Sequence, residues 1–238
     1  MQVNIVNCLF VLDSEKNDNI RKNDIKKIKV LVTKDRKLLT IKYQGKNMKD
    51  DLKSKLKDIL GTEVIHLEQV YTFASEDKVD IVYLGVGNIS NIKNLDDNFE
   101  LVDFSVKTNK SVSLGTDLYK YKTIDIEKDN NIEYIHEIEA ENNIKETLLY
   151  LLTSYKRIRA NIDISDIMFK FLPDSFTLED VRKVYELIKD TSVDKSNFRK
   201  KIVKYCEKIE TEQDTKNGYR PSQRYRFKAL KGDIWLWF

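Results

Sequence analysis

Three segments of the sequence decide the fold of the C-terminal part of the chain: Phe171-Leu-Pro-Asp-Ser-Phe-Thr-Leu-Glu-Asp180, Asp194-Lys-Ser-Asn-Phe-Arg-Lys-Lys-Ile202 and Gly218-Tyr-Arg-Pro-Ser-Gln-Arg-Tyr-Arg-Phe227. The first begins a capped amphipathic helix, the second begins a basic helix after a short turn, and the third is an arginine-rich hairpin. This order of elements is that of a winged helix-turn-helix, a unit that places a helix in a groove of DNA.

Two capping residues and two apolar stripes predict the helices of this unit. Thr177 can cap the first helix, and Asp180 in its first turn suits the helix dipole. The buried stripe of this helix comprises Leu178, Val181, Val184, Tyr185 and Ile188. Asp194 can cap the second helix, and its predicted core face comprises Phe198, Ile202, Tyr205 and Ile209. We therefore expect the second helix to continue to about residue 209.

The opposite face of the basic helix carries hydroxyl, amide, guanidinium and ammonium groups, which are the donors that contact base edges and phosphates. In the hairpin, basic residues recur at every second position and therefore share one face of a strand. For the groove and the adjacent phosphates we predict Lys195, Ser196, Asn197, Arg199 and Lys200. For phosphate or minor-groove contacts we predict Lys204, Arg220 and Arg224. A winged helix that binds protein instead of DNA is the alternative.

Charge is distributed unevenly along the chain. Its 238 residues carry a net charge of only +3. Residues 195–228 nevertheless hold eleven Lys and Arg against four Asp and Glu, while residues 1–144 come to about −3. The positive end of the molecule is thus the same third that contains the predicted recognition helix, which favours an acidic partner such as nucleic acid.

Composition excludes several classes of protein. The chain is 41% hydrophobic with two Pro and seven Gly, which is typical of a globular protein. Its apolar runs are too short for a membrane span, and no signal-type leader opens it. Cys8 and Cys206 offer no disulfide framework, and His66 and His136 have no metal-ligand spacing. We expect a cytoplasmic protein with no metal site and no required cofactor.

The N-terminal part reads as an α+β domain. Strand-like apolar runs occur around residues 3–11, 28–32, 38–43, 64–73 and 79–86, with further short strands to about residue 125. Helical spacing at 48–60 ends before Gly61, a suitable C-cap. An amphipathic pattern over 144–158 predicts a helix that connects the two domains. We place the sensor and dimerisation domain at 1–140, the connecting helix at 141–165, and the winged helix with its aromatic tail at 166–238.

These segments resemble the Nudix-related transcriptional regulators, which pair a Nudix-fold sensor with a winged helix. The stronger resemblance covers residues 165–228 and rests on Phe171-Leu-Pro, Phe176-Thr-Leu, Val184-Tyr-Glu, Asp194-Lys-x-Asn-Phe-Arg-Lys-Lys-Ile and Arg220-Pro-x-x-x-Tyr-Arg-Phe227. A weaker one covers 48–85, where Leu67-Glu-Gln-Val-Tyr-Thr-Phe73 is similar to the strand after the Nudix helix. Ser196 stands where the resemblance leads us to expect Arg, so the preferred bases can differ from those of relatives.

The resemblance also implies that the Nudix-like domain is not an enzyme. Nudix hydrolases need Gly-x5-Glu-x7-Arg-Glu-x-x-Glu-Glu-x-Gly, because its carboxylates bind the divalent cations that activate water. With the motif anchored on Gly61, its functional positions fall on Lys46, Ser54, Lys55, Asp58 and Ile59. One metal-competent carboxylate remains, and Asp50 and Asp51 lie on another part of the helix. We predict no catalytic residues.

The fold class we predict is α+β: a Nudix-like sandwich domain followed by a winged helix-turn-helix. The resemblance implies a transcriptional regulator, most simply a repressor, that binds a palindromic operator in double-stranded DNA as a homodimer. The implied effector is ADP-ribose or a related NAD-derived metabolite. Two alternatives for the first domain stay open, a different effector or a role in dimerisation alone. A divergent Nudix hydrolase and a protein-interaction adaptor remain the alternative functions.

Overall fold

A computed structural model of the chain describes residues 1–15, 25–45, 47–64, 66–107, 110–125, 133–214 and 222–228. The strands are β1 (Gln2–Glu15), β2 (Ile25–Thr33), β3 (Leu39–Lys42), β4 (His66–Ala74), β5 (Lys78–Asn88), β6 (Phe99–Lys107), β7 (Ser111–Leu114), β8 (Asp117–Asp125), β9 (Glu133–Glu139), β10 (Cys206–Asp214) and β11 (Ser222–Phe227). The helices are α1 (Met48–Leu60), α2 (Asn142–Asn161), α3 (Ile167–Lys170), α4 (Leu178–Lys189) and α5 (Lys195–Ile202), with short 3₁₀ turns η1 (Ile89–Asn91) and η2 (Val203–Tyr205).

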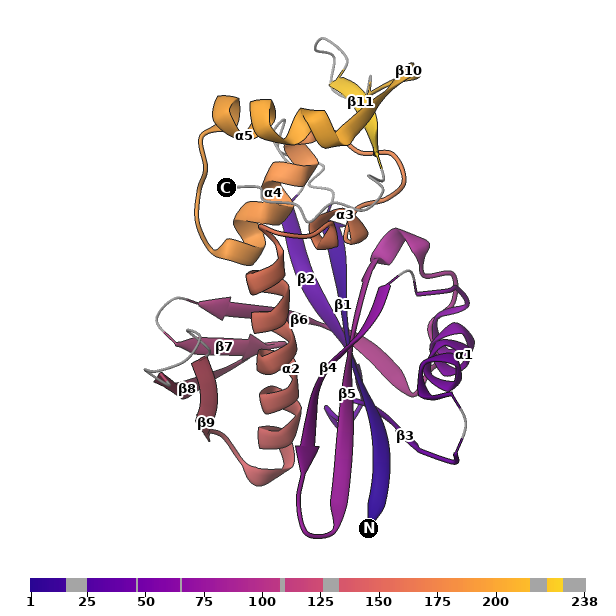
Figure 1. The fold of residues 1–238 in the computed structure, drawn as a ribbon, viewed down its shortest axis with the longest axis vertical. Helices are drawn as coiled ribbons and strands as arrows, with labels where there is room; N and C mark the ends of the chain where they lie inside the picture. The colour runs from indigo at the N-terminus through magenta and orange to yellow at the C-terminus, as the bar shows by residue number, and fades with distance from the viewer. Residues whose placement is uncertain are drawn as a thin grey trace.

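One large mixed sheet organises the N-terminal domain (Figure 1). Its strands run in the order β4-β5-β1-β2-β6-β7-β8-β9, and β3 also pairs with β1. The long central strand β1 runs parallel to β5, from Gln2 opposite Lys78 to Leu12 opposite Asn88. On its other edge β1 pairs antiparallel with β3 and then with β2. The sheet therefore brings together segments that are far apart in the sequence.

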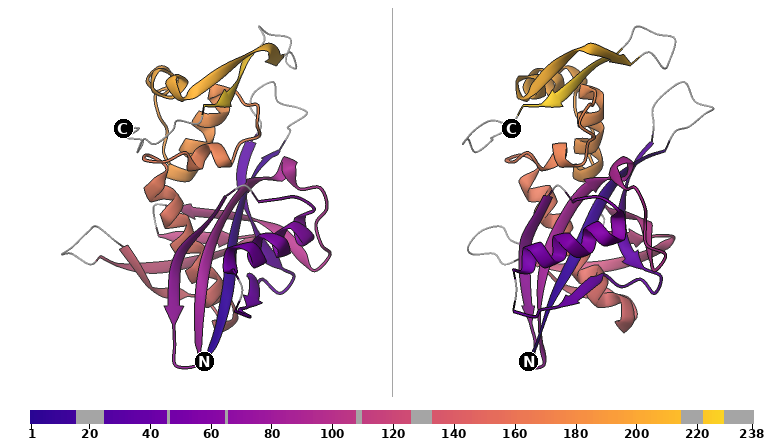
Figure 2. Two further views of the ribbon diagram at one scale, coloured as in Figure 1. Left: turned by 45° about the vertical axis from the view of Figure 1, so that its right-hand side comes forward. Right: turned by 90° about the vertical axis from the view of Figure 1, so that its right-hand side faces the viewer.

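Both faces of β1 are buried, because α1 covers one face of the sheet and α2 covers the other (Figure 2). Side chains alternate along a strand, so Ile5, Leu9 and Val11 pack with α1 while Cys8 and Phe10 pack on the α2 side. This arrangement explains why β1 is an almost continuous apolar run in the sequence.

Local signals set the ends of α1. The Asn47 side chain accepts hydrogen bonds from the backbone N–H groups of Lys49 and Asp50, and Gly61 follows the last turn with a φ of 64°. The predicted helix over residues 48–60 and its glycine C-cap are therefore present in the structure. Between these ends, Leu52, Leu56, Ile59 and Leu60 are buried.

The winged helix lies at the end of the molecule to which the C-terminal ends of β1 and α2 point (Figure 1). Thr177 caps α4 in a complete capping box with Asp180, as the sequence predicts, and all five residues of the predicted stripe of α4 are buried. Strands β10 and β11 form the wing. Reciprocal backbone hydrogen bonds of 2.9 Å and 2.8 Å between Phe176 and Tyr225 fasten this wing to the segment before α4.

The expectation that the basic helix continues to Ile209 is wrong. Helix α5 ends at Ile202, η2 follows, and β10 begins at Cys206. Pairing with β11 is the cause, because Cys206 lies opposite Phe227 and Lys208 lies opposite Tyr225. Phe198, Ile202 and Tyr205 are buried as predicted, whereas Ile209 lies on the wing.

One strand, β9, was not predicted from the sequence. Residues 133–139 form β9, which pairs with β8 and packs against α2. The predicted domain boundaries stay a prediction, although α2 falls within the segment assigned to the connecting helix.

The described residues include no helix that is long and apolar enough to cross a membrane.

Candidate nucleic-acid interface

The exposed face of α5 is set by its cap and by its buried residues. The Asp194 carboxylate accepts a hydrogen bond of 2.7 Å from the backbone N–H of Asn197, which fixes the first turn. Phe198 and Ile202 point into the core at 3% and 1% exposure. Because these two residues hold one face inward, the opposite face of the helix is directed to solvent.

The polar residues predicted on α5 are all exposed. They are Lys195, Ser196, Asn197, Arg199 and Lys200, and Lys204 is exposed just after the helix. Within the described part of the chain, Arg199 and Lys200 have no ion-pair partner. In contrast, the Lys195 ammonium lies 3.4 Å from the Glu179 carboxylate. The Lys204 ammonium lies 4.8 Å from the centre of the Tyr205 ring. Cations without a partner on a helix are available to bind an anion.

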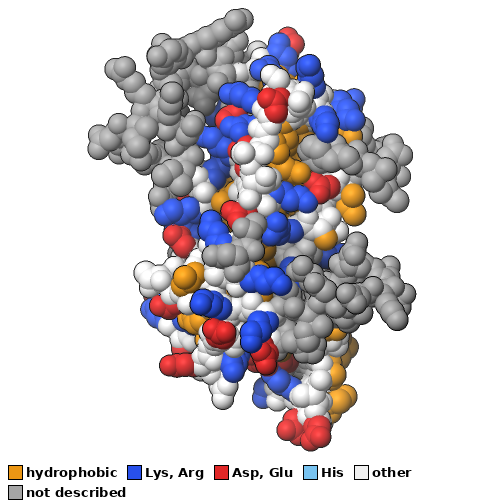
Figure 3. Space-filling model, turned by 90° about the vertical axis from the view of Figure 1, so that its left-hand side faces the viewer, with side chains coloured by type: hydrophobic (Ala, Val, Ile, Leu, Met, Phe, Trp, Pro, Cys, Tyr) orange, Lys and Arg blue, Asp and Glu red, His pale blue; other side chains and the backbone are white. Residues whose placement is uncertain are grey.

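Two further exposed residues belong to this surface. Lys201 is exposed beside Lys200, and Val203 follows the helix with 39% of its surface accessible. The sequence signal for Lys201 was the unbroken Arg-Lys-Lys run, in which the third member was left out of the predicted set. On the face shown in Figure 3, Lys and Arg side chains are spread over the upper part of the molecule, with some acidic side chains among them.

The wing places its aromatic and basic side chains on different sides. Tyr225 is buried at 8% exposure, while Arg226 and Lys228 are exposed. Arg224 is half-buried, and its guanidinium donates a hydrogen bond of 3.1 Å to the Ser175 carbonyl oxygen. Arg224 therefore helps to hold the segment before α4. Arg220 lies outside the described residues.

In the N-terminal domain, the positions of the Nudix motif lie on or beside α1. Ser54, Lys55 and Asp58 are exposed and Ile59 is buried, while Lys46 lies outside the described residues. Among the residues that the structure describes, no group of three or more His, Cys, Asp and Glu gathers to hold a metal ion. The α1 surface thus presents a mixture of cations and single carboxylates.

A small polar cavity of about 130 Å³ lies between β1, β5 and the N-terminal half of α2. Asp80 is buried at its wall, where it accepts hydrogen bonds from Asn4 at 2.7 Å and Tyr150 at 2.6 Å and pairs with Lys78 at 2.8 Å. Burial alone would raise the pKa of the Asp80 carboxyl, but these donors outweigh it and hold the pKa below its usual value. The carboxylate therefore stays ionised.

A family model and a curated relative each match part of the chain. Residues 168–227 match the family model of the NrtR DNA-binding winged helix domain. The chain is 29% identical over 84 residues, 35% of its length, to the ADPR-responsive transcriptional repressor NtrR of Acinetobacter baylyi; this match spans 34% of that relative.

Two solved structures share the fold over nearly the whole chain. The MutT/nudix family protein of Enterococcus faecalis aligns with a TM-score of 0.63 at 15% identity, over 95% of this chain and 86% of its own. NrtR of Shewanella oneidensis in complex with a 27mer DNA aligns with a TM-score of 0.60 at 13% identity, over 95% of this chain and 93% of its own. The predicted fold, a Nudix-like fold followed by a winged helix, is therefore confirmed.

Proposed function

We propose that this NrtR-like chain, which joins a Nudix-like domain to a winged helix, is a DNA-binding transcriptional repressor of the cytoplasm. The observation that carries the proposal is the exposed face of α5, where Arg199 and Lys200 have no ion-pair partner within the described part of the chain. Cations held outward on the second helix of such a motif suit the major groove of DNA.

The proposed contacts divide by position. Residues at the start of α5 face the groove and the adjacent phosphates: Lys195, Ser196, Asn197, Arg199 and Lys200. Lys204, Arg220 and Arg224 bind phosphates or reach the minor groove. A homodimer with two-fold symmetry would place two copies of α5 on a palindromic operator, with half-sites about one or two helical turns apart.

The proposed role of the Nudix-like domain is to bind an effector without cleaving it. ADP-ribose, to which the Acinetobacter relative responds by name, or a related NAD-derived metabolite is the proposed effector. The motif positions support binding without hydrolysis, because Lys55 and Ile59 replace groups that would hold cations in an enzyme. The effector would act by binding one arrangement of the two subunits better than the other.

Selection from genomic DNA tests the DNA-binding proposal. Purified protein is incubated with sheared genomic DNA of its source at near-physiological salt, and the retained fragments are sequenced. We expect one enriched palindrome. A variant with Arg199→Ala and Lys200→Ala should lose the enrichment. The control variant, with Lys53→Ala and Lys55→Ala, lacks two exposed cations of α1 and should keep it. No enrichment by the unaltered protein would favour the protein-interaction adaptor.

Hydrolysis tests the alternative enzyme. The protein is incubated with ADP-ribose and Mg²⁺ or Mn²⁺, and AMP release is followed by chromatography. We expect no release above that of buffer with metal alone. Turnover above this level would revive the divergent Nudix hydrolase as the function of the first domain.

A further inference from the structure

Side chains of the connecting helix satisfy the C-terminal end of α4. The last carbonyl groups of a helix have no partner within the helix. Here the Tyr155 hydroxyl donates a hydrogen bond of 3.0 Å to the Ile188 carbonyl, and the Arg159 guanidinium donates one of 3.0 Å to the Lys189 carbonyl. Both donors come from α2, and the positive charge of Arg159 also suits the negative end of the α4 dipole.

The N-terminal end of α4 is held by the sheet. Asp180, which completes the capping box of α4, pairs with the Lys26 ammonium at 3.0 Å. Lys26 belongs to β2, and its side chain is only 8% exposed. An ion pair that is largely removed from water holds its geometry more strictly than an exposed pair. The scaffold helix of the winged unit is therefore held at both ends by residues of the N-terminal domain and α2.

The turn between α4 and α5 continues this connection. Asp190 at the end of α4 lies 3.6 Å from the Lys107 ammonium of β6. The Glu186 carboxylate accepts a hydrogen bond of 2.9 Å from the backbone N–H of Val193, just before the Asp194 cap. These contacts fix the first turn of α5 relative to α4. The rings of Tyr185 and Phe198 also pack between the two helices, with their centroids 5.4 Å apart.

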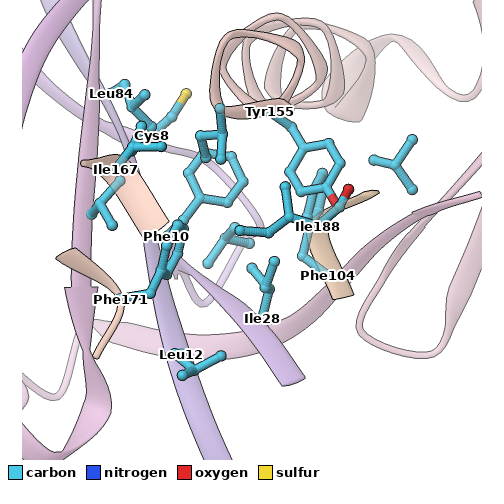
Figure 4. Packing of buried hydrophobic residues seen from close by; sticks show 14 of the residues in the cluster. Cys8, Phe10, Leu12, Ile28, Leu84, Phe104, Tyr155, Ile167, Phe171 and Ile188 are labelled. Atoms are coloured by element: carbon cyan, nitrogen blue, oxygen red, sulfur yellow. The ribbon is translucent and has the colours of Figure 1, made fainter. Parts of the chain in front are cut away.

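Apolar packing also joins the two domains at this junction. Ile188 packs into the core that contains Phe10, Phe104 and Tyr155 (Figure 4). Beside that core, a crevice of about 450 Å³ lies between the end of β6 and the turn after α4. The polar contacts add a directional constraint to this packing, since hydrogen bonds have preferred angles and apolar contacts do not.

We propose that Lys26, Tyr155 and Arg159 are positioning residues, which set the orientation of α5 relative to the N-terminal domain and hence its fit to DNA. The inference rests on the proposed DNA-binding function. A recognition helix that is free to reorient must lose that freedom on binding, and this cost lowers affinity for a site that requires one orientation. Non-specific binding through phosphates tolerates many orientations and does not depend on this constraint.

Three substitutions test the proposal, and the two that remove a charge each have a control that removes the same charge. Tyr155→Phe removes only the hydroxyl that caps α4, Arg159→Ala removes the second cap, and Lys26→Ala removes the ion pair. Arg157→Ala is the control for Arg159, because Arg157 lies on the same helix and pairs with Glu68 of β4 at 2.6 Å. Lys29→Ala is the control for Lys26, because Lys29 lies on the same strand and pairs with Asp13 at 2.9 Å.

Affinity is measured for the selected operator and for a random duplex of the same length, at a temperature where every variant is folded. We expect each positioning variant to lose about three- to tenfold in operator affinity. Its affinity for the random duplex should equal that of its control, or that of the unaltered protein in the case of Tyr155→Phe. A role in stability alone would lower the melting temperature without changing the ratio of the two affinities. Positioning variants whose ratio equals that of the controls would overturn the proposal.

Amide hydrogen exchange separates this inference from the proposed function. If the unaltered protein binds no operator, the proposed function fails, and the junction is then tested without DNA. Faster exchange of the α5 amides in Tyr155→Phe and Arg159→Ala than in Arg157→Ala would support a positioning role. Equal exchange in all three variants would overturn it.

Discussion

Gly61 ends α1 in the left-handed region, with a φ of 64°. A β-carbon added at this position would lie 3.1 Å from the Asn94 backbone nitrogen and 3.3 Å from the Lys93 β-carbon. Both of these residues fold back to donate backbone hydrogen bonds to the Leu60 carbonyl. The glycine thus permits the backbone conformation and the close approach of the next segment at the same point.

Gly61→Ala should lower the free energy of unfolding by about 1–2 kcal/mol for the left-handed conformation, with an additional steric cost. Gly45→Ala is the matched control, because Gly45 also has a positive φ of 81° but an added β-carbon would meet no atom of the described residues within 4 Å. Urea unfolding of both variants measures the difference. The two substitutions costing the same free energy would contradict the assigned close contact.

Single residues were predictable from the sequence where the signal is local. Thr177 and Asp194 cap their helices as predicted, because a capping side chain bonds to the backbone only a few residues away. The orientations of Glu68 and Tyr71 were not predictable, since a bulge shifts the register of β4 between Gln69 and Tyr71. Glu68 consequently faces Arg157 of α2 while Tyr71 is 42% exposed.

At the scale of elements, α5 shows where periodicity fails as a guide. Apolar residues at 198, 202, 205 and 209 fit a helix over its whole predicted length. The change to a strand at Cys206 depends on pairing with β11, which is brought alongside by the wing. The parallel pairing of β1 with β5 likewise joins residues that are far apart in the sequence, so no local pattern predicts it.

The ion pair at the start of α4 predicts an acid response. Burial alone would raise the pKa of the Asp180 carboxyl, but the Lys26 ammonium and the donors of Thr177 outweigh burial, so the pKa lies below its usual value in the folded protein. A carboxyl whose folded-state pKa is lowered contributes stability that is present above its unfolded pKa and lost as the pH falls through the folded value.

The difference in unfolding free energy between the unaltered protein and Lys26→Ala should therefore be greatest near neutral pH. It should shrink as the pH falls from about 4, the ordinary pKa of an unfolded Asp, through the lowered folded-state pKa at which Asp180 becomes protonated. Urea unfolding at several pH values measures it. In an Asp180→Asn background, the effect of Lys26→Ala should depend less on pH over this range. A difference that grows toward acid pH would contradict the assignment.

At the scale of the whole molecule, the two domains share a core. Residues of the sheet, α2, α3, α4 and α5 belong to one continuous buried cluster, and the side chain of Asn88 in β5 donates a hydrogen bond of 2.8 Å to the Phe171 carbonyl. The sequence indicated both domains and the basic C-terminal third. It did not indicate their mutual orientation, because Lys26, Tyr155 and Arg159 have no local pattern that points to α4.

A shared core leads to a prediction about the effector. ADP-ribose should weaken operator binding by about 5- to 150-fold, the usual range of coupling between two sites, and operator DNA should weaken ADP-ribose binding by the same factor. Fluorescence anisotropy of labelled operator with and without ADP-ribose measures the first effect, and calorimetry measures the second. AMP is the control. Unchanged affinity would favour a different effector or a domain that serves dimerisation.

The central claim is that α5 reads DNA, and it is tested most directly by titrating the selected operator at 50 to 200 mM salt. Three proteins are compared: the unaltered chain, the variant with Arg199→Ala and Lys200→Ala, and the control with Lys53→Ala and Lys55→Ala. The account predicts that affinity of the unaltered chain falls steeply with salt, by about 10³-fold or more if six phosphates are contacted.

It also predicts that the α5 variant loses about 1–3 kcal/mol of binding free energy for each side chain that contacts a base, while the α1 control binds as the unaltered chain does. Affinity that is insensitive to salt and equal in all three proteins would contradict the account and assign the winged helix to a protein partner.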